Sequence, residues 1–127
     1  LESAAVRRVV FCSGKVYFDL LEARRAKSQT DVALVRIEQL YPFPGAEYAA
    51  VLERYPQARE VVWCQEEPQN QGAWYQVRHQ LQRPLRKGQE LYYAGRPRAA
   101  APAPGIFQLH VQQQQALVET ALSADVV

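Results

Sequence analysis

Short apolar runs alternate with longer amphipathic stretches along most of the chain. The apolar runs are rich in β-branched and aromatic residues and end in polar or glycine-containing segments, which is typical of buried strands. They predict four strands, at Arg8–Cys12, Val32–Ile37, Glu60–Gln65 and Glu90–Ala94. The stretches after them carry apolar residues at helical spacing. They predict helices at Val16–Lys27, Gly45–Tyr55, Ala73–Gln82 and Gln112–Leu122.

Proline and glycine mark the segments between these elements. Pro42 and Pro44 exclude a helix between Glu38 and Pro44, because proline lacks an N–H group and restricts the residue before it. The segment Gly95–Gly105 is rich in Pro, Ala and Arg, which predicts an extended surface loop. The run Ile106–His110 is compatible with a short strand or with the start of a helix.

The alternation of strands and helices predicts the α/β fold class. A mainly parallel sheet of four or five strands would be covered by helices on both faces. The carboxyl ends of parallel strands lie at one edge of the sheet, where open α/β sheets usually carry ligand or interface groups. The loops expected at this edge are Ser13–Lys15, Glu38–Pro44, Glu66–Gly72 and Gly95–Gly105.

Composition narrows the class of protein further. The chain has 127 residues, of which 48% are hydrophobic and 22% charged, as expected for one globular domain with a core. The net charge of +2, without a run of like charges, argues against nucleic acid or an anionic membrane as partner. We expect no signal peptide and no transmembrane helix. The absence of Met indicates a piece cut from a longer protein or a processed chain.

The segment Val61–Trp74 concentrates more hydrogen-bonding groups than any other part of the chain. Its amides and carboxylates either close a turn and face solvent, or form a ligand or interface site. Glu66 and Glu67 are adjacent, so at a strand end they point in opposite directions, which argues against an acid–base pair. Trp63 and Trp74 are interpreted as core or interface anchors.

Two cationic positions follow predicted strands. Lys15, in the segment Ser13–Lys15, either binds an anion at the helix N-terminus or lies in solvent while Ser13 caps the helix. A complete phosphate loop needs more glycines than Gly14 alone. Arg36 either pairs with a carboxylate such as Glu38 or Glu67, or binds an anion.

No catalytic or metal-binding pattern emerges from the remaining polar residues. Cys12 and Cys64 lie in apolar strand patterns and are expected to be buried free thiols, which suits a reducing cytosolic compartment. His79 and His110 are far from each other and from both cysteines, so no metal-ligand spacing is present. Neither Cys has a neighbouring His, and no Ser sits in a nucleophile-elbow pattern.

Four segments, in order and at the right spacing, resemble one known family. They are Val10–Tyr17, Val35–Pro44, Trp63–Trp74 and Tyr93–Pro97. These segments resemble the C-terminal domain of the decarboxylase (first) component of 2-oxoglutarate dehydrogenase, over about Arg8–Leu122. The resemblance implies that residues 1–127 form one domain with the transketolase C-terminal fold. That fold is a three-layer α/β/α sandwich, mostly parallel with one antiparallel strand.

The resemblance also implies what the parent enzyme does. It would be a homodimer dependent on thiamine diphosphate and magnesium that oxidatively decarboxylates 2-oxoglutarate. It would pass the succinyl group to a lipoyl arm of the dihydrolipoyl succinyltransferase component, in the citric acid cycle. The cofactors and catalytic histidines belong to upstream domains, so no catalytic, cofactor or metal residue carries over and the fragment alone is expected to be inactive. The expected location is the bacterial cytoplasm, in preference to a mitochondrial matrix.

Two roles for the domain itself follow from the resemblance. As a structural and assembly domain it packs on the upstream domains and the dimer mate. Its interface element is then the loop of Glu66, Glu67, Asn70, Gln71 and Trp74. As a regulatory module it binds acetyl-CoA or a nucleotide such as AMP. The candidate regulator site is Ser13, Lys15, Arg36 and Gln39.

The chain departs from the family pattern near its end. Ala99 and Ala100 stand where family members tend to have Ser, and glutamines follow His110 where members tend to have a Glu. No regulatory residue is therefore carried over to this segment.

Overall fold

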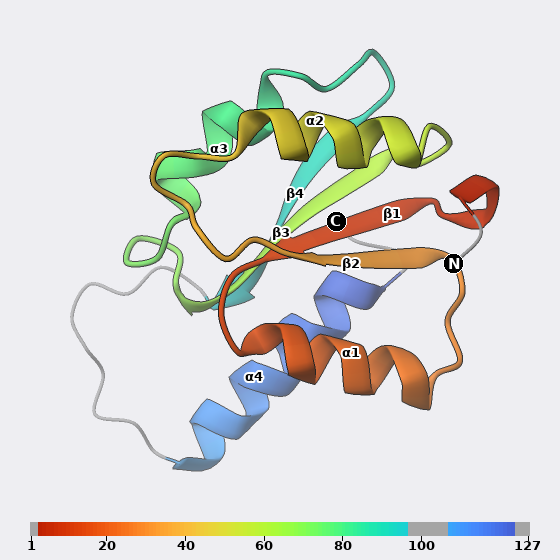
Figure 1. The fold of residues 1–127 in the computed structure, drawn as a ribbon. Helices are drawn as coiled ribbons and strands as arrows, with labels where there is room; N and C mark the ends of the chain where they lie inside the picture. The colour runs from red at the N-terminus through yellow and green to blue at the C-terminus, as the bar shows by residue number, and fades with distance from the viewer. Residues whose placement is uncertain (1–2, 97–106, 124–127) are drawn as a thin grey trace.

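A four-stranded parallel sheet forms the centre of the molecule. The computed structural model describes residues 3–96 and 107–123, and within residues 107–110 it describes the backbone only. The strand order is β2-β1-β3-β4, and every neighbouring pair is parallel (Figure 1). The strands are β1 (Arg8–Cys12), β2 (Val32–Arg36), β3 (Glu60–Pro68) and β4 (Glu90–Arg96).

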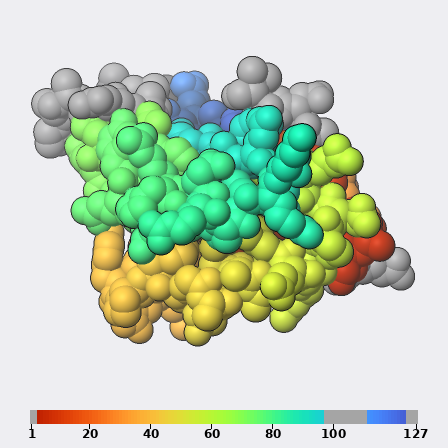
Figure 2. Space-filling model, turned by 90° about the horizontal axis from the view of Figure 1, so that it is seen from above, coloured from red at the N-terminus to blue at the C-terminus, as the bar shows by residue number. Residues whose placement is uncertain are grey.

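Two helices cover each face of the sheet. They are α1 (Val16–Ala26), α2 (Gly45–Arg54), α3 (Trp74–Gln82) and α4 (Phe107–Leu122). A short 3-10 helix, η1 (Ser3–Ala5), precedes the first strand. The helices α1 and α4 lie on one face, and α2 and α3 lie on the other (Figure 1). Figure 2 views the second face, where α2 and α3 lie side by side. The predicted three-layer α/β/α sandwich is confirmed.

The strands supply apolar side chains alternately to two cores. Phe11 and Trp63 pack with α2 and α3, and Val10 and Val62 pack with α1 and α4. All five residues of β1 are buried, which is expected for a central strand of a sheet covered on both faces. The near-continuous apolar runs of the sequence therefore reflect burial on both sides.

The element boundaries follow the predictions to within one residue, except at the ends of β3 and β4 and at the start of α4. β3 continues to Pro68, with a register shift between Gln65 and Pro68, and β4 continues to Arg96. The prediction of a loop beginning at Gly95 is therefore wrong for Gly95 and Arg96, because both pair with β3; residues 97–105 lie outside the described part. The helix alternative holds for residues 107–110, since α4 begins at Phe107. Within residues 3–96 and 107–123 all strands are parallel, so no antiparallel strand is found there.

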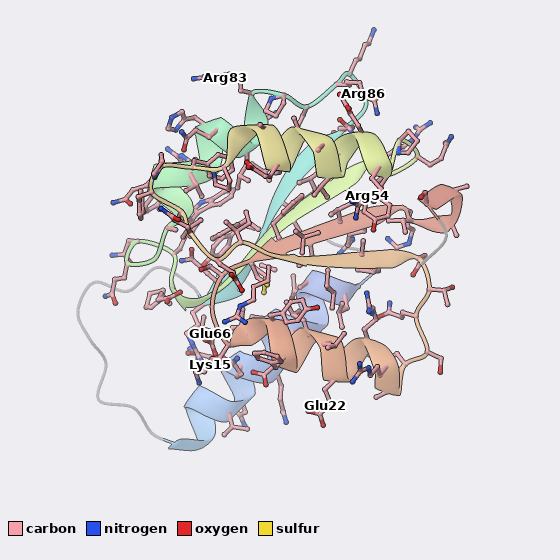
Figure 3. The ribbon with its side chains drawn as sticks, in the orientation of Figure 1. Lys15, Glu22, Arg54, Glu66, Arg83 and Arg86 are labelled. Atoms are coloured by element: carbon pink, nitrogen blue, oxygen red, sulfur yellow. The ribbon has the colours of Figure 1, made fainter. Side chains whose placement is uncertain are left out.

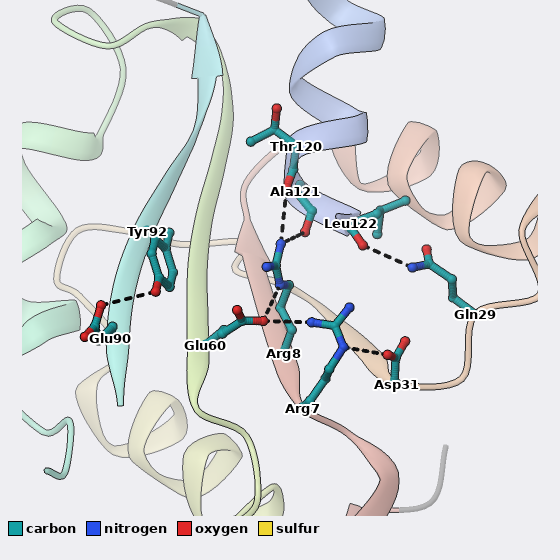
Figure 4. A network of polar contacts seen from close by, with 10 residues as sticks. All are labelled: Arg7, Arg8, Gln29, Asp31, Glu60, Glu90, Tyr92, Thr120, Ala121 and Leu122. Carbon is teal, nitrogen blue, oxygen red and sulfur yellow. Dashed lines mark hydrogen bonds and ion pairs between the residues drawn. The ribbon is translucent and has the colours of Figure 1, made fainter. Parts of the chain in front are cut away.

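Polar contacts at the amino edge of the sheet hold the end of the last helix. The Arg8 side chain is fully buried, and its Nε donates to Glu60 Oε1 at 3.0 Å. Its Nη1 donates to the backbone oxygens of Thr120 (3.2 Å) and Ala121 (3.1 Å), as Figure 4 shows. Gln29 Nε2 donates to the Leu122 oxygen at 3.0 Å. These donors satisfy carbonyls that a helix leaves unpaired at its C-terminus.

Candidate functional site

The polar loops predicted at the carboxyl edge of the sheet come together there. Because all four strands are parallel, the segments after β1, β2 and β3 leave the sheet on the same side. Figure 3 shows Lys15, which follows β1, and Glu66, near the end of β3, next to each other at this edge. The edge is therefore the candidate functional site, and its side chains belong to two groups on opposite faces of the sheet.

On the α2/α3 face, Gln65 fixes the loop between β3 and α3. The side chain is 2% exposed, and its Oε1 accepts hydrogen bonds from Trp63 Nε1 (2.8 Å) and from the Trp74 backbone N–H (3.0 Å). Its Nε2 donates to the backbone oxygens of Glu67 (3.1 Å) and Pro68 (3.0 Å). One amide thus ties the strand, the loop and the first residue of α3 together.

Gly72 is needed for the same contact. A Cβ atom at residue 72 would lie 2.6 Å from Gln65 Nε2 and 2.8 Å from Oε1. These distances are too short for real atoms, so a side chain here would displace the Gln65 amide. The sequence analysis did not single out Gln65 as a site residue. The available signal was a carboxamide at the end of an apolar strand, together with a glycine before a tryptophan.

On the α1/α4 face, Glu66 lies within a polar cluster. Gln114 Nε2, from α4, donates to Glu66 Oε1 and to Asp19 Oδ2, at 2.9 Å each. Lys15 Nζ is 3.7 Å from Glu66 Oε1, but the Lys15 side chain is 84% exposed, so this ion pair contributes little. The carboxylate of Glu66 is therefore already engaged by α4 and by the loop after β1, and Gln114 connects it to Asp19 on α1.

Arg96 joins this cluster from the end of β4. The residue is 7% exposed, and its Nη1 and Nη2 donate to Gln113 Oε1 and Gln114 Oε1, at 2.8 Å each. Gln113 and Gln114 of α4 therefore bind a buried guanidinium. The cluster fixes α4 over the ends of β3 and β4.

The four candidate regulator residues lie at the same edge in different surroundings. Ser13 is half-buried, and it does not cap α1, because the N-cap is Lys15 without a side-chain hydrogen bond; the capping alternative is wrong. The Arg36 guanidinium stacks over the Phe18 ring, with Cζ 5.3 Å from its centroid. Among the ion pairs of the described residues none includes Arg36, so its pairing with a carboxylate is not found. Gln39 Nε2 donates to the Tyr41 oxygen at 3.2 Å. Regulator binding stays a prediction.

The five candidate interface residues divide into surface and core. Glu67 and Gln71 are exposed, whereas Glu66 and Asn70 are half-buried. Trp74 is 9% exposed and packs inside this chain, with its ring centroid 5.2 Å from that of Tyr93. Trp74 therefore supports the loop from within the core. The interface role of the other four residues stays a prediction.

The two cysteines are buried free thiols, as predicted. Cys12 and Cys64 are paired in register on β1 and β3. Burial raises the pKa of the Cys12 thiol to about 12 and also raises the pKa of Cys64. Both thiols are therefore protonated at neutral pH and poor nucleophiles. His79 is exposed on α3, and the His110 side chain lies outside the described part.

Residues 3–96 and 107–123 contain neither a metal-ligand cluster nor a membrane-spanning helix. No group of three or more His, Cys, Asp or Glu side chains is placed to hold a metal ion in that part of the chain. None of the helices described there is both long and apolar enough to cross a membrane.

Comparison with known proteins identifies the family. A family model described as 2-oxoglutarate dehydrogenase C-terminal matches residues 1–122. The chain belongs to this family. It is 55% identical over 123 residues to the 2-oxoglutarate dehydrogenase E1 component of Haemophilus influenzae and 51% identical over 123 residues to that of Cupriavidus necator. Each match covers 97% of this chain but 13% of the relative, so the chain spans a small part of the length of these proteins.

Proposed function

We propose that residues 1–127 are the C-terminal domain of a 2-oxoglutarate dehydrogenase E1 component. The parent enzyme would oxidatively decarboxylate 2-oxoglutarate and pass the succinyl group to a lipoyl arm. The observation that carries this proposal is the identity of 51% and 55% to two E1 components over 97% of the chain. The family model over residues 1–122 supports it.

Within such an enzyme the domain would have a structural and assembly role. Its polar groups at the carboxyl edge bond mainly to other groups of this domain: Gln65 bonds to Trp63, and Glu66 and Arg96 both bond to Gln114. Thiamine diphosphate and magnesium would supply the decarboxylation chemistry when bound. Among residues 3–96 and 107–123 no group of three or more His, Cys, Asp or Glu side chains is placed to hold the metal ion. The cofactors would therefore bind in the preceding part of the longer chain.

The partners of the domain follow from the same proposal. They would be the preceding domains of its own chain, the mate in a homodimer and the dihydrolipoyl succinyltransferase component. The relatives are bacterial proteins, which supports the proposal that the parent enzyme functions in the bacterial cytoplasm.

A chimaera tests the proposal directly. Residues 1–127 would replace the matching segment of the Haemophilus influenzae E1 component, and carbon dioxide release from 2-oxoglutarate would be measured. We expect a rate within about tenfold of the parent, equivalent to about 1.4 kcal/mol of transition-state free energy. Two variants of the parent serve as controls: one is truncated before the replaced segment, and the other has its own segment reinserted through the same junction. Pyruvate replaces 2-oxoglutarate as a control for substrate.

One outcome would contradict the proposal. A chimaera with the parent's oligomeric state, but with a rate no higher than that of the truncated parent, would mean that this chain cannot serve as an E1 C-terminal domain.

A further inference from the structure

The exposed large apolar side chains gather at one edge of the sheet. Among the described residues, the large hydrophobic side chains that are exposed are Phe18 (55%), Tyr41 (58%) and Tyr75 (37%). Phe18 is in the first turn of α1, Tyr41 follows β2, and Tyr75 is the second residue of α3. All three positions follow the carboxyl ends of strands, although α1 and α3 cover opposite faces.

Contacts join the first two aromatic residues across the edge. Arg36 Cζ is 5.3 Å from the centroid of Phe18, and Arg36 and Gln39 line one hollow. Gln39 donates to the backbone oxygen of Tyr41, and the Tyr41 hydroxyl donates to Gln76 Oε1 on α3. The surface is therefore continuous from α1 across β2 to α3.

A second arginine extends the surface along α3. Arg78 Cζ is 4.9 Å from the centroid of the Tyr75 ring. Tyr75 directly precedes Gln76, which accepts the hydrogen bond from Tyr41. Stacking holds both guanidinium groups in place, which lowers the entropy lost on binding. We name the set Phe18, Arg36, Tyr41, Tyr75 and Arg78 the aromatic–arginine band. Aromatic residues and Arg are enriched in protein interfaces, and Tyr and Arg among the residues that dominate their binding energy.

The hollow beside the band favours a polypeptide over a small anion. It has a volume of about 280 Å³ at the end of β2. Glu38 and Glu47 line it together with Arg36 and Gln39, so its charge is not positive overall. The apolar residues that line it are Phe11, Val35, Ile37, Pro44, Tyr48 and Val51. A lining that is mostly apolar and of mixed charge suits an apolar side chain of a protein segment better than a phosphate or a carboxylate.

We propose that the aromatic–arginine band is the docking surface for the part of the longer chain that precedes residue 1, and that one apolar side chain of that part fills the hollow. This inference rests on the proposed function, because it requires the longer chain. The chain spans 13% of the length of its E1 relatives, so the preceding part is several times larger than this domain. The chain enters β1 at the amino edge, about 17 Å from the carboxyl edge for a strand of this length. A preceding part of that size extends past this distance.

A photocrosslinking experiment in the chimaera tests the inference. Tyr41 would be replaced by p-benzoylphenylalanine, and crosslinked peptides would be identified by mass spectrometry after irradiation. We expect crosslinks to peptides upstream of residue 1. Phe18→Ala together with Tyr75→Ala should lower their yield about fivefold or more, since truncating central interface residues weakens binding by at least this factor.

The matched control is Arg54→Ala together with Arg83→Ala. These exposed residues lie at the C-terminal ends of α2 and α3, away from the band, and Figure 3 shows them on the α2/α3 side. The control should leave the crosslink yield unchanged. Two outcomes would overturn the inference. In one, all crosslinks join the probe to residues 1–127 of its own chain or of the dimer mate. In the other, the probe reacts with solvent and forms no crosslink. Carbon dioxide release by the same chimaera reports separately on the proposed function.

Discussion

The Gln65 side-chain amide is held in one position, because its oxygen and its nitrogen both form hydrogen bonds with neighbouring groups. It accepts from Trp63 and Trp74 and donates to two backbone oxygens of the following loop. Moving it would leave several buried groups without partners, each at a cost of about 1–3 kcal/mol. The absence of a side chain at Gly72 protects this arrangement.

We therefore expect Gly72→Ala to lower the free energy of unfolding by about 1–3 kcal/mol, since the new Cβ displaces a buried, fully bonded amide. Gly45→Ala is the matched control, because nothing lies within 4 Å of a Cβ there and the residue opens α2. That change should leave stability the same or raise it by up to about 1 kcal/mol. Urea unfolding of residues 1–127, followed by tryptophan fluorescence, measures both. Equal stability of the two variants would contradict this account of the loop.

At the scale of elements, α4 depends on contacts with the start of the chain. Arg8 on β1 binds the last carbonyls of α4, 112 and 113 residues further along. The guanidinium is fully buried and shares Glu60 with Arg7 (Figure 4). The contacts therefore hold α4 in place at its C-terminal end, and Gln113 and Gln114 hold it nearer its N-terminal end.

Removing the guanidinium should loosen α4 before the rest of the sheet. We expect Arg8→Met to lower the free energy of unfolding by about 2–4 kcal/mol, because buried carbonyls lose their donors. Amide hydrogen exchange in α4 should speed up more than exchange in β1 or β3. Arg25→Met, at an exposed position on α1, is the control and should change neither quantity. Equal acceleration in α4 and β3 would mean that the helix is not held separately.

The sequence pattern predicted most elements but few of the contacts between them. Apolar periodicity located the four strands and four α-helices of the described residues, because each is buried along a regular face, but it did not predict the short η1. It did not locate the end of β4, because Arg96 is a charged residue that is buried only where α4 supplies two glutamines. The pattern predicted no role for Gln65, because the hydrogen-bond partners of its side chain depend on the conformation of the loop between β3 and α3. Lys15, Arg36 and Gln39 were correctly placed at one edge, since that follows from parallel strands alone.

For the whole molecule, one sheet connects both cores. Val10 and Phe11 are neighbours on β1, yet one packs with α1 and α4 and the other with α2 and α3. Loss of either core would expose one face of the same central strands. We therefore expect the two cores to unfold together.

Residues 1–127, expressed alone, should unfold in one cooperative transition and release no carbon dioxide from 2-oxoglutarate. Tryptophan fluorescence reports on the α2/α3 core through Trp63 and Trp74, and circular dichroism reports on all helices. Coincident urea transitions by the two methods are the expected result. Two separate transitions would contradict a single folding unit, and measurable decarboxylation would contradict a purely structural role.

The position of α4 makes the domain sensitive to incomplete synthesis. A polypeptide that stops before this helix lacks Leu117, Val118, Ala121 and Leu122, which complete one of the two cores. It would also leave the Arg8 guanidinium, and the part of the sheet that α4 covers, open to water. Such a truncated product would expose apolar surface and tend to aggregate, whereas a product that contains α4 buries that surface. A polypeptide without α4 would therefore be a better target for proteases and chaperones than one that contains it.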